Sequence, residues 1–256
     1  MDTDSKSQWG LIISGLLLVV ILIFSGVGVM SWINSGSDVR TLEDSGIVRD
    51  DRRTIRDQVG RTVFTPVNPA GDVFKKVTSS EHDGISYTAR PDVEWQRLSG
   101  QTERSASRDY PFSAVAGPWK ITDGVAHGFA HTPQGAALAG IHMLNGLAQG
   151  GADAARFSLQ FVDDDTSAQI AEYLLAHPEE PQLPEMPWAN VFVAYAIADY
   201  TGDHARVSYA LADGENFASW DIEVHWVDGD WKMHADSVAD TTKPVFESQI
   251  SSWVQL

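Results

Sequence analysis

The sequence predicts an α+β protein in which one N-terminal transmembrane helix precedes a domain of about three helices packed on an antiparallel sheet. Three observations support this prediction. An uncharged apolar stretch occupies residues 11–32, helix signals recur between residues 132 and 177, and the hydrophobic period then changes to two. Because the helices precede the sheet in the chain, we expect them to cover its apolar face.

The segment 11–32 is the predicted membrane anchor. It contains no charged residue, and at about 1.5 Å per residue a helix of this length crosses the ~30 Å hydrocarbon core of a bilayer. Trp9 and Trp32 bracket it, where aromatic rings prefer the membrane interface. A cleaved secretory signal is the alternative, but the apolar region of a signal is usually about 7–15 residues long. We therefore predict an uncleaved anchor that contacts the lipid bilayer through residues 11–32.

The predicted orientation keeps residues 1–10 as a cytoplasmic head and places the C-terminal domain outside the cytoplasm. The nearby positive charges argue the other way, because Arg40 and Arg49 follow the span and only Lys6 precedes it. Long domains translocate largely regardless of charge, however, and acidic residues alternate with these arginines. The predicted location is the cell membrane, with a single pass.

Two connecting segments are predicted between the anchor and the domain. Residues 33–61 are polar, mixed in charge and poor in aromatic side chains, which is typical of a flexible stalk, with a short helix near residues 50–59. Residues 62–124 contain many turn residues between short apolar runs, so we expect an extended tether that lies against the domain. The α+β domain is then expected to comprise residues 125–256.

Charge and cysteine content exclude several classes of function. The chain has 18 Lys and Arg against 35 Asp and Glu, a formal net charge of −17. Residues 125–256 carry 4 of the basic and 19 of the acidic residues, so the acidity belongs to the predicted domain. This charge disfavours direct binding of nucleic acid and favours basic partners. Because the chain has no cysteine, disulfides, thiolate metal sites and cysteine nucleophiles are impossible.

Helix signals open the predicted domain. Thr132 and Pro133 provide a hydroxyl cap and a first-turn proline, and a helix is expected to continue to about Gln149. Small and apolar residues surround this helix on more than one side, which predicts a core position. Two further helices are expected, within residues 152–162 and over residues 167–177, before a proline-rich loop.

The remainder of the domain is predicted to be an antiparallel meander. The β-rich runs are residues 190–199, 206–212, 217–227 and 231–235. A two-residue turn at Asp228-Gly229 would place Trp226 opposite Trp231 and Glu223 opposite His234. By alternation, Glu223 and His225 then share the polar face of the sheet, and Trp226 belongs to the apolar face.

Two motifs in this region carry a family resemblance. Residues 117–140 read GPWKITDGVAHGFAHTPQGAALAG, and residues 226–231 read WVDGDW. They resemble membrane-anchored proteins encoded on actinobacterial conjugative and integrative elements, a family of largely uncharacterised function. In that family an exported tether, a D-G-V-x-x-G-F-x-H-T-P-Q-G-A helix entry and a W-x-D-G-D-W hairpin recur. The resemblance covers roughly residues 90–256.

A second resemblance concerns the fold. The order of helices followed by a curved sheet is similar to the nuclear-transport-factor-2-like cone fold of bitopic scaffold subunits in type IV secretion channels. This similarity implies a cone-like domain whose curved antiparallel sheet is covered by the helices. It implies assembly rather than catalysis, by analogy of fold alone.

No metal, cofactor or catalytic site is predicted from the residue pattern. His127, His131 and His142 are close in sequence, but they lack the i, i+4 spacing of zinc ligands on one helix. Asp163-Asp164-Asp165 lacks the alternating ligands and glycine of a calcium loop, and is better placed as negative charge at a helix N-terminus. We therefore expect hydrogen-bonded histidines and no bound ion.

A hidden general base was also considered. Cone-fold enzymes carry an Asp or His inside the pocket between sheet and helices, and Asp199, Asp221 and His225 are the candidates here. Alternation turns Asp221 and His225 away from the apolar face, and no nucleophile or phosphate-binding motif is visible. We therefore predict that the protein is not an enzyme. Trp253 is a candidate partner-facing anchor.

The predicted function is an extracytoplasmic protein-binding scaffold in a conjugative transfer or type IV secretion-like assembly. Its expected partners are other membrane or envelope proteins of the transfer machine, including a second copy of the chain as a homo-oligomer. The alternative is an envelope domain with an isomerase-like pocket that binds a small ligand. A dry cavity with one inward Asp or His would favour this alternative, and a filled core would count against it.

Overall fold

The computed structural model describes residues 52–77, 90–99, 107–149, 151–177, 191–213, 216–235, 237 and 243–256. The predicted head, the predicted anchor at 11–32 and most of the predicted stalk lie outside these residues. Among the helices in the described ranges, none combines the length and apolar character that a membrane crossing requires.

Strands make up most of the regular structure. The strands are β1 (Thr54–Arg56), β2 (Thr62–Phe64), β3 (Glu94–Leu98), β4 (Arg108–Phe112), β5 (Lys120–Thr122), β6 (Val125–His127), β7 (Phe192–Tyr200), β8 (His204–Asp213), β9 (Asn216–Val227), β10 (Asp230–Met233), β11 (Lys243–Val245) and β12 (Val254–Gln255). The helices are α2 (Pro133–Ala148), α3 (Gly151–Phe157), the 3-10 turn η2 (Ser158–Gln160), α4 (Asp165–Ala176) and α5 (Glu247–Ile250). The fold class is α+β, as predicted.

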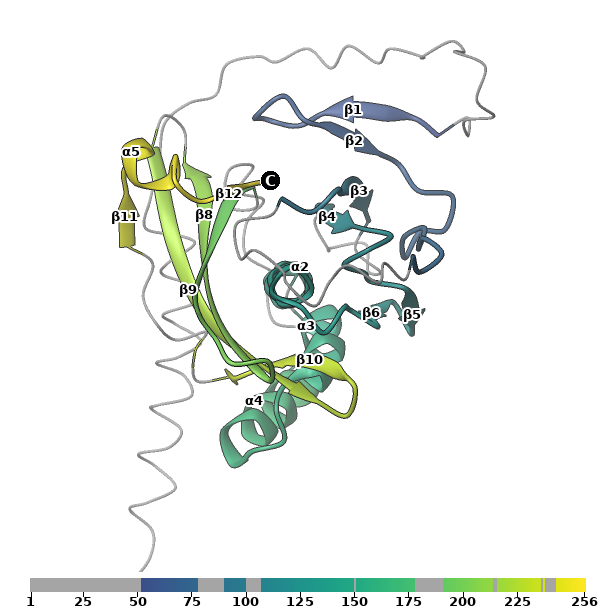
Figure 1. Cartoon of the computed structure of the whole chain (residues 1–256). Coiled ribbons are helices and arrows are strands. Elements are labelled where there is room, and N and C mark those ends of the chain that lie inside the picture. Colours follow the sequence, from purple (N-terminus) through teal and green to yellow (C-terminus); the bar gives the residue numbers. More distant parts are fainter. Residues whose placement is uncertain are drawn as a thin grey trace, which may run out of the picture.

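One central helix lies between two sheets (Figure 1). The larger sheet has the strand order β10-β9-β8-β7-β12, with β11 paired to β9, and the smaller sheet has the order β1-β2-β3-β4. Strands β5 and β6 form a separate hairpin. The long strands β8 and β9 bend past α2, so the larger sheet is curved (Figure 1).

Helix α2 is the centre of the core. It begins at the predicted cap, because the Thr132 hydroxyl accepts a hydrogen bond from the Gly135 N–H at 3.1 Å. Every residue of α2 except Leu147 is buried. Glycine allows the sheet to approach closely, since a Cβ atom on Gly140 would lie only 2.1 Å from the Tyr209 hydroxyl oxygen. The small residues of the motif therefore let the neighbouring elements pack closely around α2 on all sides.

The larger sheet confirms the predicted register. Trp231 pairs with Trp226 and Lys232 pairs with His225, as a two-residue turn at Asp228-Gly229 requires. Strands β7 to β9 are antiparallel neighbours along the chain. Ile222 is buried against the core, whereas His225 is only half-buried on the opposite face. Period-two alternation therefore separates an apolar inner face from a polar outer face.

The smaller sheet differs from the predicted tether. Strands β2 and β3 pair in parallel, β3 and β4 pair in antiparallel, and β4 packs on α2. The boundary drawn at residue 125 falls inside one hairpin, because Thr122 of β5 pairs with Val125 of β6. The described part of residues 62–124 thus contributes short strands to the same folded unit, and Pro111 lies inside β4 rather than in a turn.

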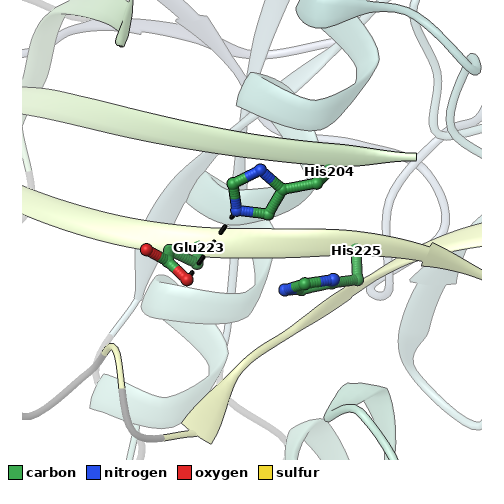
Figure 2. Close-up of side chains that lie close together, drawn as sticks. All are labelled: His204, Glu223 and His225. Atoms are coloured by element: carbon green, nitrogen blue, oxygen red, sulfur yellow. Dashed lines mark ion pairs between the residues drawn. The ribbon is translucent and has the colours of Figure 1, made fainter. Parts of the chain in front are cut away.

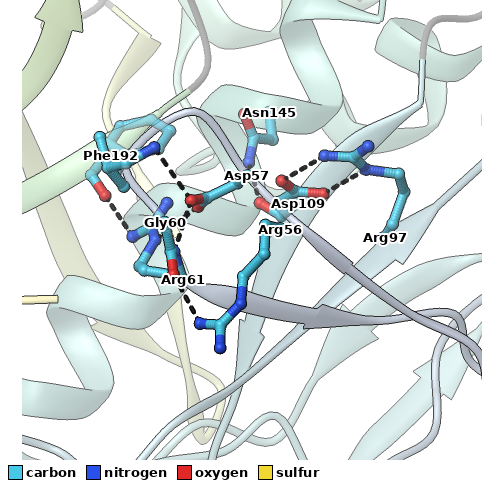
Figure 3. Close-up of polar contacts among 9 residues, drawn as sticks. Arg56, Asp57, Gly60, Arg61, Arg97, Asp109, Asn145 and Phe192 are labelled. Atoms are coloured by element: carbon cyan, nitrogen blue, oxygen red, sulfur yellow. Dashed lines mark hydrogen bonds and ion pairs between the residues drawn. The ribbon is translucent and has the colours of Figure 1, made fainter. Parts of the chain in front are cut away.

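The predicted short helix near residues 50–59 is wrong in its described part. Residues 54–56 form strand β1, which pairs with β2 through a tight loop. The Asp57 carboxylate shapes this loop by accepting hydrogen bonds from the backbone N–H groups of Val59 and Arg61. The Arg61 guanidinium then donates to the Phe192 carbonyl at 2.6 Å (Figure 3). The end of the predicted stalk is therefore fixed to the domain.

Candidate functional site

The two motifs that carry the family resemblance lie against each other. The Asp230 carboxylate accepts hydrogen bonds from the Gly128 N–H at 2.8 Å and from the Phe129 N–H at 3.1 Å. The Trp231 indole N–H donates to the Ala130 carbonyl at 2.8 Å. The β9–β10 hairpin thus holds the segment that leads into α2, and both motifs have a structural explanation in this junction.

His131 completes the junction. Its ring stacks on the Trp226 indole, with centroids 4.1 Å apart and an interplanar angle of 10°. Its Nε2 atom lies 2.9 Å from the Gly202 carbonyl and 3.0 Å from the Asp203 carboxylate. The β7–β8 turn, the β9–β10 hairpin and the entry to α2 therefore meet at one imidazole.

The three histidines that are close in sequence occupy three different environments. His127 is half-exposed near Asp230, with 3.8 Å between its Nδ1 atom and the carboxylate. His142 is fully buried in α2, where its Nε2 donates to the Pro111 carbonyl at 2.7 Å. Burial lowers the pKa of His142 to about 4, partly offset by this hydrogen bond. The structure does not bring His127, His131 and His142 together as metal ligands.

The acidic residues considered for chemistry are also separate. Asp164 caps α4 by accepting a hydrogen bond from the Ser167 N–H at 2.8 Å, so the predicted role of this acidic run at a helix start is confirmed. Asp199 is exposed on β7. Asp221 lies on the outer face of β9, as the alternation predicted. Trp253 is half-buried and packs against Ile250.

A group of polar side chains gathers on the outer face of the larger sheet. His204 on β8 is the cross-strand partner of His225 on β9, and Glu223 lies two residues before His225. One ligand atom of each side chain lies within 4.8 Å of the other two. Figure 2 shows the His204 ring extending from β8 towards Glu223, with His225 beside them on β9. We call these three residues the His-Glu cluster.

A third imidazole borders the His-Glu cluster. His234 follows β10, and its backbone N–H donates to the Glu223 carbonyl at 2.9 Å. The ring centroids of His225 and His234 are 5.2 Å apart, and those of His204 and His225 are 4.8 Å apart. Strands β8 and β9 and the residue after β10 thus place three imidazole rings side by side.

The electrostatics of the cluster favour an uncharged His225 beside a charged Glu223. The pKa of His225 is lowered, first by burial and then by the nearby His204 and His234 rings. For Glu223, burial raises the pKa of the carboxyl. The hydrogen bond and charge of Arg206, with smaller contributions from the two adjacent histidines, reverse this effect and leave the pKa below its ordinary value.

A cleft of about 470 Å³ lies elsewhere, beside the smaller sheet. Aromatic side chains line it together with charged residues, among them Phe64, Trp95, Arg52 and Glu94. Arg52 and Glu94 already pair with each other at 2.6 and 3.0 Å. Arg52 and Glu94 therefore neutralise each other, and Asp92 adds a negative charge to the lining.

The sequence did not single out the His-Glu cluster. It placed Glu223 and His225 on the polar face of β9, but the predicted second strand began at Arg206, two residues after His204. Extending that strand by two residues would have included His204, and the register in the structure sets it opposite His225. The signal that could have found His204 was the period-two alternation, which continues from Arg206 towards the turn.

Comparison with known proteins identifies a family. A family model described as a domain of unknown function, DUF8175, matches residues 62–255. No curated protein and no solved structure matches the chain. The match begins at β2 and ends in β12, so it includes α2, the larger sheet and all of the smaller sheet except β1. The chain therefore belongs to the DUF8175 family.

Proposed function

We propose that this chain is a membrane-anchored, extracytoplasmic protein-binding scaffold in a conjugative transfer or type IV secretion-like assembly. The proposal combines the apolar segment at residues 11–32 with a domain whose interior is filled. The resemblance of the GFAHTPQGAALA motif to proteins of actinobacterial conjugative elements supplies the setting. The cone-like shape is part of the same proposal.

The enclosed central helix is the observation that carries this proposal. A pocket for a small ligand in a cone-like domain needs space between the helix and the curved sheet. Here the Tyr209 and Ile222 side chains fill the space at Gly140, and the Phe157 ring fills it at Gly146. A domain packed in this way offers its surface, rather than its interior, to other molecules. This close packing around α2 favours the scaffold over the small-ligand alternative, which needs space between the helix and the sheet.

Phe246 is the first candidate for a partner contact. It lies between β11 and α5, and 73% of its surface is exposed, a larger fraction than for any other Phe, Tyr or Trp that the structure describes. Aromatic side chains are frequent anchors of protein interfaces. The net negative charge of residues 125–256 would favour a partner with basic residues.

The proposed mechanism is multivalent. An anchor in the bilayer confines the domain to two dimensions, so that the effective concentration of neighbouring subunits is high. Modest contacts between domains then suffice for assembly, and no bond is made or broken.

Site-specific photo-crosslinking in native membranes tests this function. A photoreactive phenylalanine analogue at position 246 should form adducts with another protein of the same transfer assembly or with a second copy of the chain. The matched control is the analogue at Leu175, which is 62% exposed on α4. Phe246→Ala should weaken the contact by about 2 kcal/mol, or roughly 30-fold in affinity, and lower transfer frequency accordingly. Adducts with lipid alone at both positions would contradict the proposal.

The absence of cysteine allows a direct test of orientation. Ser251→Cys, at an exposed position of the domain, should react with a membrane-impermeant maleimide on intact cells. Ser5→Cys, in the head, should react only after the membrane is permeabilised. The reverse pattern would overturn the proposed topology.

A further inference from the structure

The His-Glu cluster has the donor atoms of a metal site and lies outside every structural role described above. The junction of the two motifs uses His131, and the core uses His142. His204, Glu223 and His225 instead share the outer face of two neighbouring strands (Figure 2). The sheet fixes the backbone of these three residues, so only rotation of their side chains changes the distances between their ligand atoms.

One nitrogen of the cluster lacks a partner. The Nε2 atom of His225 is buried and forms no hydrogen bond with the residues that the structure describes. A buried polar atom without a partner destabilises the folded state, so its presence calls for an explanation. A neutral imidazole nitrogen donates its lone pair to a metal, so a bound ion would supply the partner that this atom lacks.

Glu223 is oriented in the way that carboxylate ligands are in metal sites. Its Oε1 atom accepts hydrogen bonds from Arg206 at 2.9 and 3.2 Å. Its Oε2 atom faces the Nε2 atom of His204 at 3.7 Å. Arg206 thus occupies one oxygen and aims the other at the two imidazoles. Such outer hydrogen bonds to a ligand fix its direction and tune the metal.

We propose that His204, Glu223 and His225 bind one divalent transition-metal ion of the Zn²⁺ class. Two imidazole nitrogens and one carboxylate oxygen suit zinc and disfavour Ca²⁺ or Mg²⁺, which prefer sites built from oxygen alone. Three protein ligands leave a fourth position for water or for a further donor. His234, whose ring centroid is 5.2 Å from that of His225, is the nearest imidazole to that position among the described residues.

Only a small movement is needed to form this site. Ligand atoms around tetrahedral zinc at bond lengths of about 2.0–2.1 Å lie roughly 3.4 Å from one another. The ligand atoms of the cluster already lie within 4.8 Å of one another. Rotation of the half-buried side chains closes this difference without moving the strands.

Zinc titration of the full-length, detergent-solubilised chain tests the proposal. The protein is stripped with a chelator, any affinity tag is removed, and binding is followed by calorimetry with ZnCl₂. We expect one ion per chain and a rise in Tm on binding. His225→Ala and Glu223→Gln should each weaken binding by at least roughly 10–100-fold, the loss that even an outer hydrogen-bonding change causes. Arg206→Met should also weaken zinc binding by roughly 10–100-fold.

His177→Ala is the matched control. His177 is exposed at the end of α4, where its ring stacks on Tyr173, and it belongs to no group of metal ligands in the described chain. This variant should bind zinc as tightly as the wild type. Equal affinity in wild type, His225→Ala and Glu223→Gln would place the ion elsewhere and overturn the proposal, as would an absence of stoichiometric binding to the wild type.

A spectroscopic readout protects the test against variants that fail to fold. Co²⁺ added to the wild-type chain should give the strong visible absorption of a four-coordinate site, and zinc should displace it. In ¹⁵N-resolved NMR spectra, zinc should shift the ring signals of His204 and His225 and leave those of His177 unchanged. A shift of His177 alone would contradict the assignment.

Discussion

The two sides of α2 are packed by different kinds of contact. Towards the larger sheet the contact is mainly apolar, with Tyr209 and Ile222 pressed against Gly140 and one hydrogen bond from the Tyr209 hydroxyl to the Ala137 carbonyl. Towards β4 it is polar: His142 donates to the Pro111 carbonyl at 2.7 Å, and Asn145 donates to the Asp109 carbonyl at 3.0 Å. One face of α2 is therefore held by the close packing of side chains, and the other face is held by hydrogen bonds, which depend on direction.

The difference explains how the smaller sheet is held in place. Apolar packing tolerates small shifts along a helix, whereas a hydrogen bond weakens steeply with angle. The polar side chains of α2 reach backbone carbonyls of β4, so they fix the position of that strand along the helix. Figure 3 shows that β4 is held from its other side as well, because Arg97 binds the Asp109 carboxylate at 2.7 and 2.8 Å. The apolar side provides stability, and the polar side provides register.

The largest effect is expected on the apolar side. Tyr209 is completely buried, and Tyr209→Ala removes a ring from the centre of the core. Large-to-small changes of aromatic core residues cost about 3–5 kcal/mol. Tyr209→Phe is the matched control: it removes only the hydroxyl, which donates to the Ala137 carbonyl at 2.7 Å, and should cost about 0.5–1.5 kcal/mol. Denaturant unfolding measures the free energy of unfolding of both variants. Similar losses for the two would contradict the view that packing of the ring holds this side of α2.

The second effect belongs to the polar side and depends on pH. Burial lowers the pKa of His142 to about 4 in the folded chain, against about 6.5 in an unfolded one. The unfolded state therefore binds the extra proton first, and stability falls as the pH falls from about 6.5 towards 4. The expected loss from this residue is about 3 kcal/mol by pH 4.

His142→Gln isolates this loss. The amide can still donate to the Pro111 carbonyl, but it does not titrate, so the free energy of unfolding should depend less on pH between 7 and 4. His177→Gln removes an exposed histidine and should leave the wild-type slope unchanged. If His142→Gln retained the full slope, the charge-sensitive group would have to lie elsewhere.

The apolar side could be predicted from the sequence, and the polar side could not. Thr132 and the small residues after it predict a buried helix, and the turn at Asp228-Gly229 sets the register of β9 and β10. Both signals are local, since a cap and a hairpin need only neighbouring residues. The smaller sheet has no such signal, because β2 and β3 are separated by some thirty residues and pair in parallel.

The same reasoning applies to the candidate metal site. Alternation along β9 places Glu223 and His225 on one face, but His204 comes from the first residue of β8. Strand ends are the least certain part of a prediction from sequence, and here the difference of two residues hid the third ligand. The Arg206 contact that orients Glu223 depends on cross-strand pairing, which the sequence predicted only for β9 and β10.

The smallest effect tests whether the polar side of α2 depends on its hydrogen bonds or on the volume of its side chains. Asn145 is buried, and Asn145→Leu has nearly the same size but no donor for the Asp109 carbonyl. Loss of one buried hydrogen bond should cost about 1–2 kcal/mol, less than the costs expected for Tyr209→Ala and for the protonation of His142. If polar contacts set register, hydrogen exchange in β4 should increase while β8 stays protected, because the strand loses its position before the core loses its packing. Uniform loss of protection in β4 and β8 would mean that Asn145 contributes only to overall stability, and the division of α2 into two kinds of contact would then be wrong.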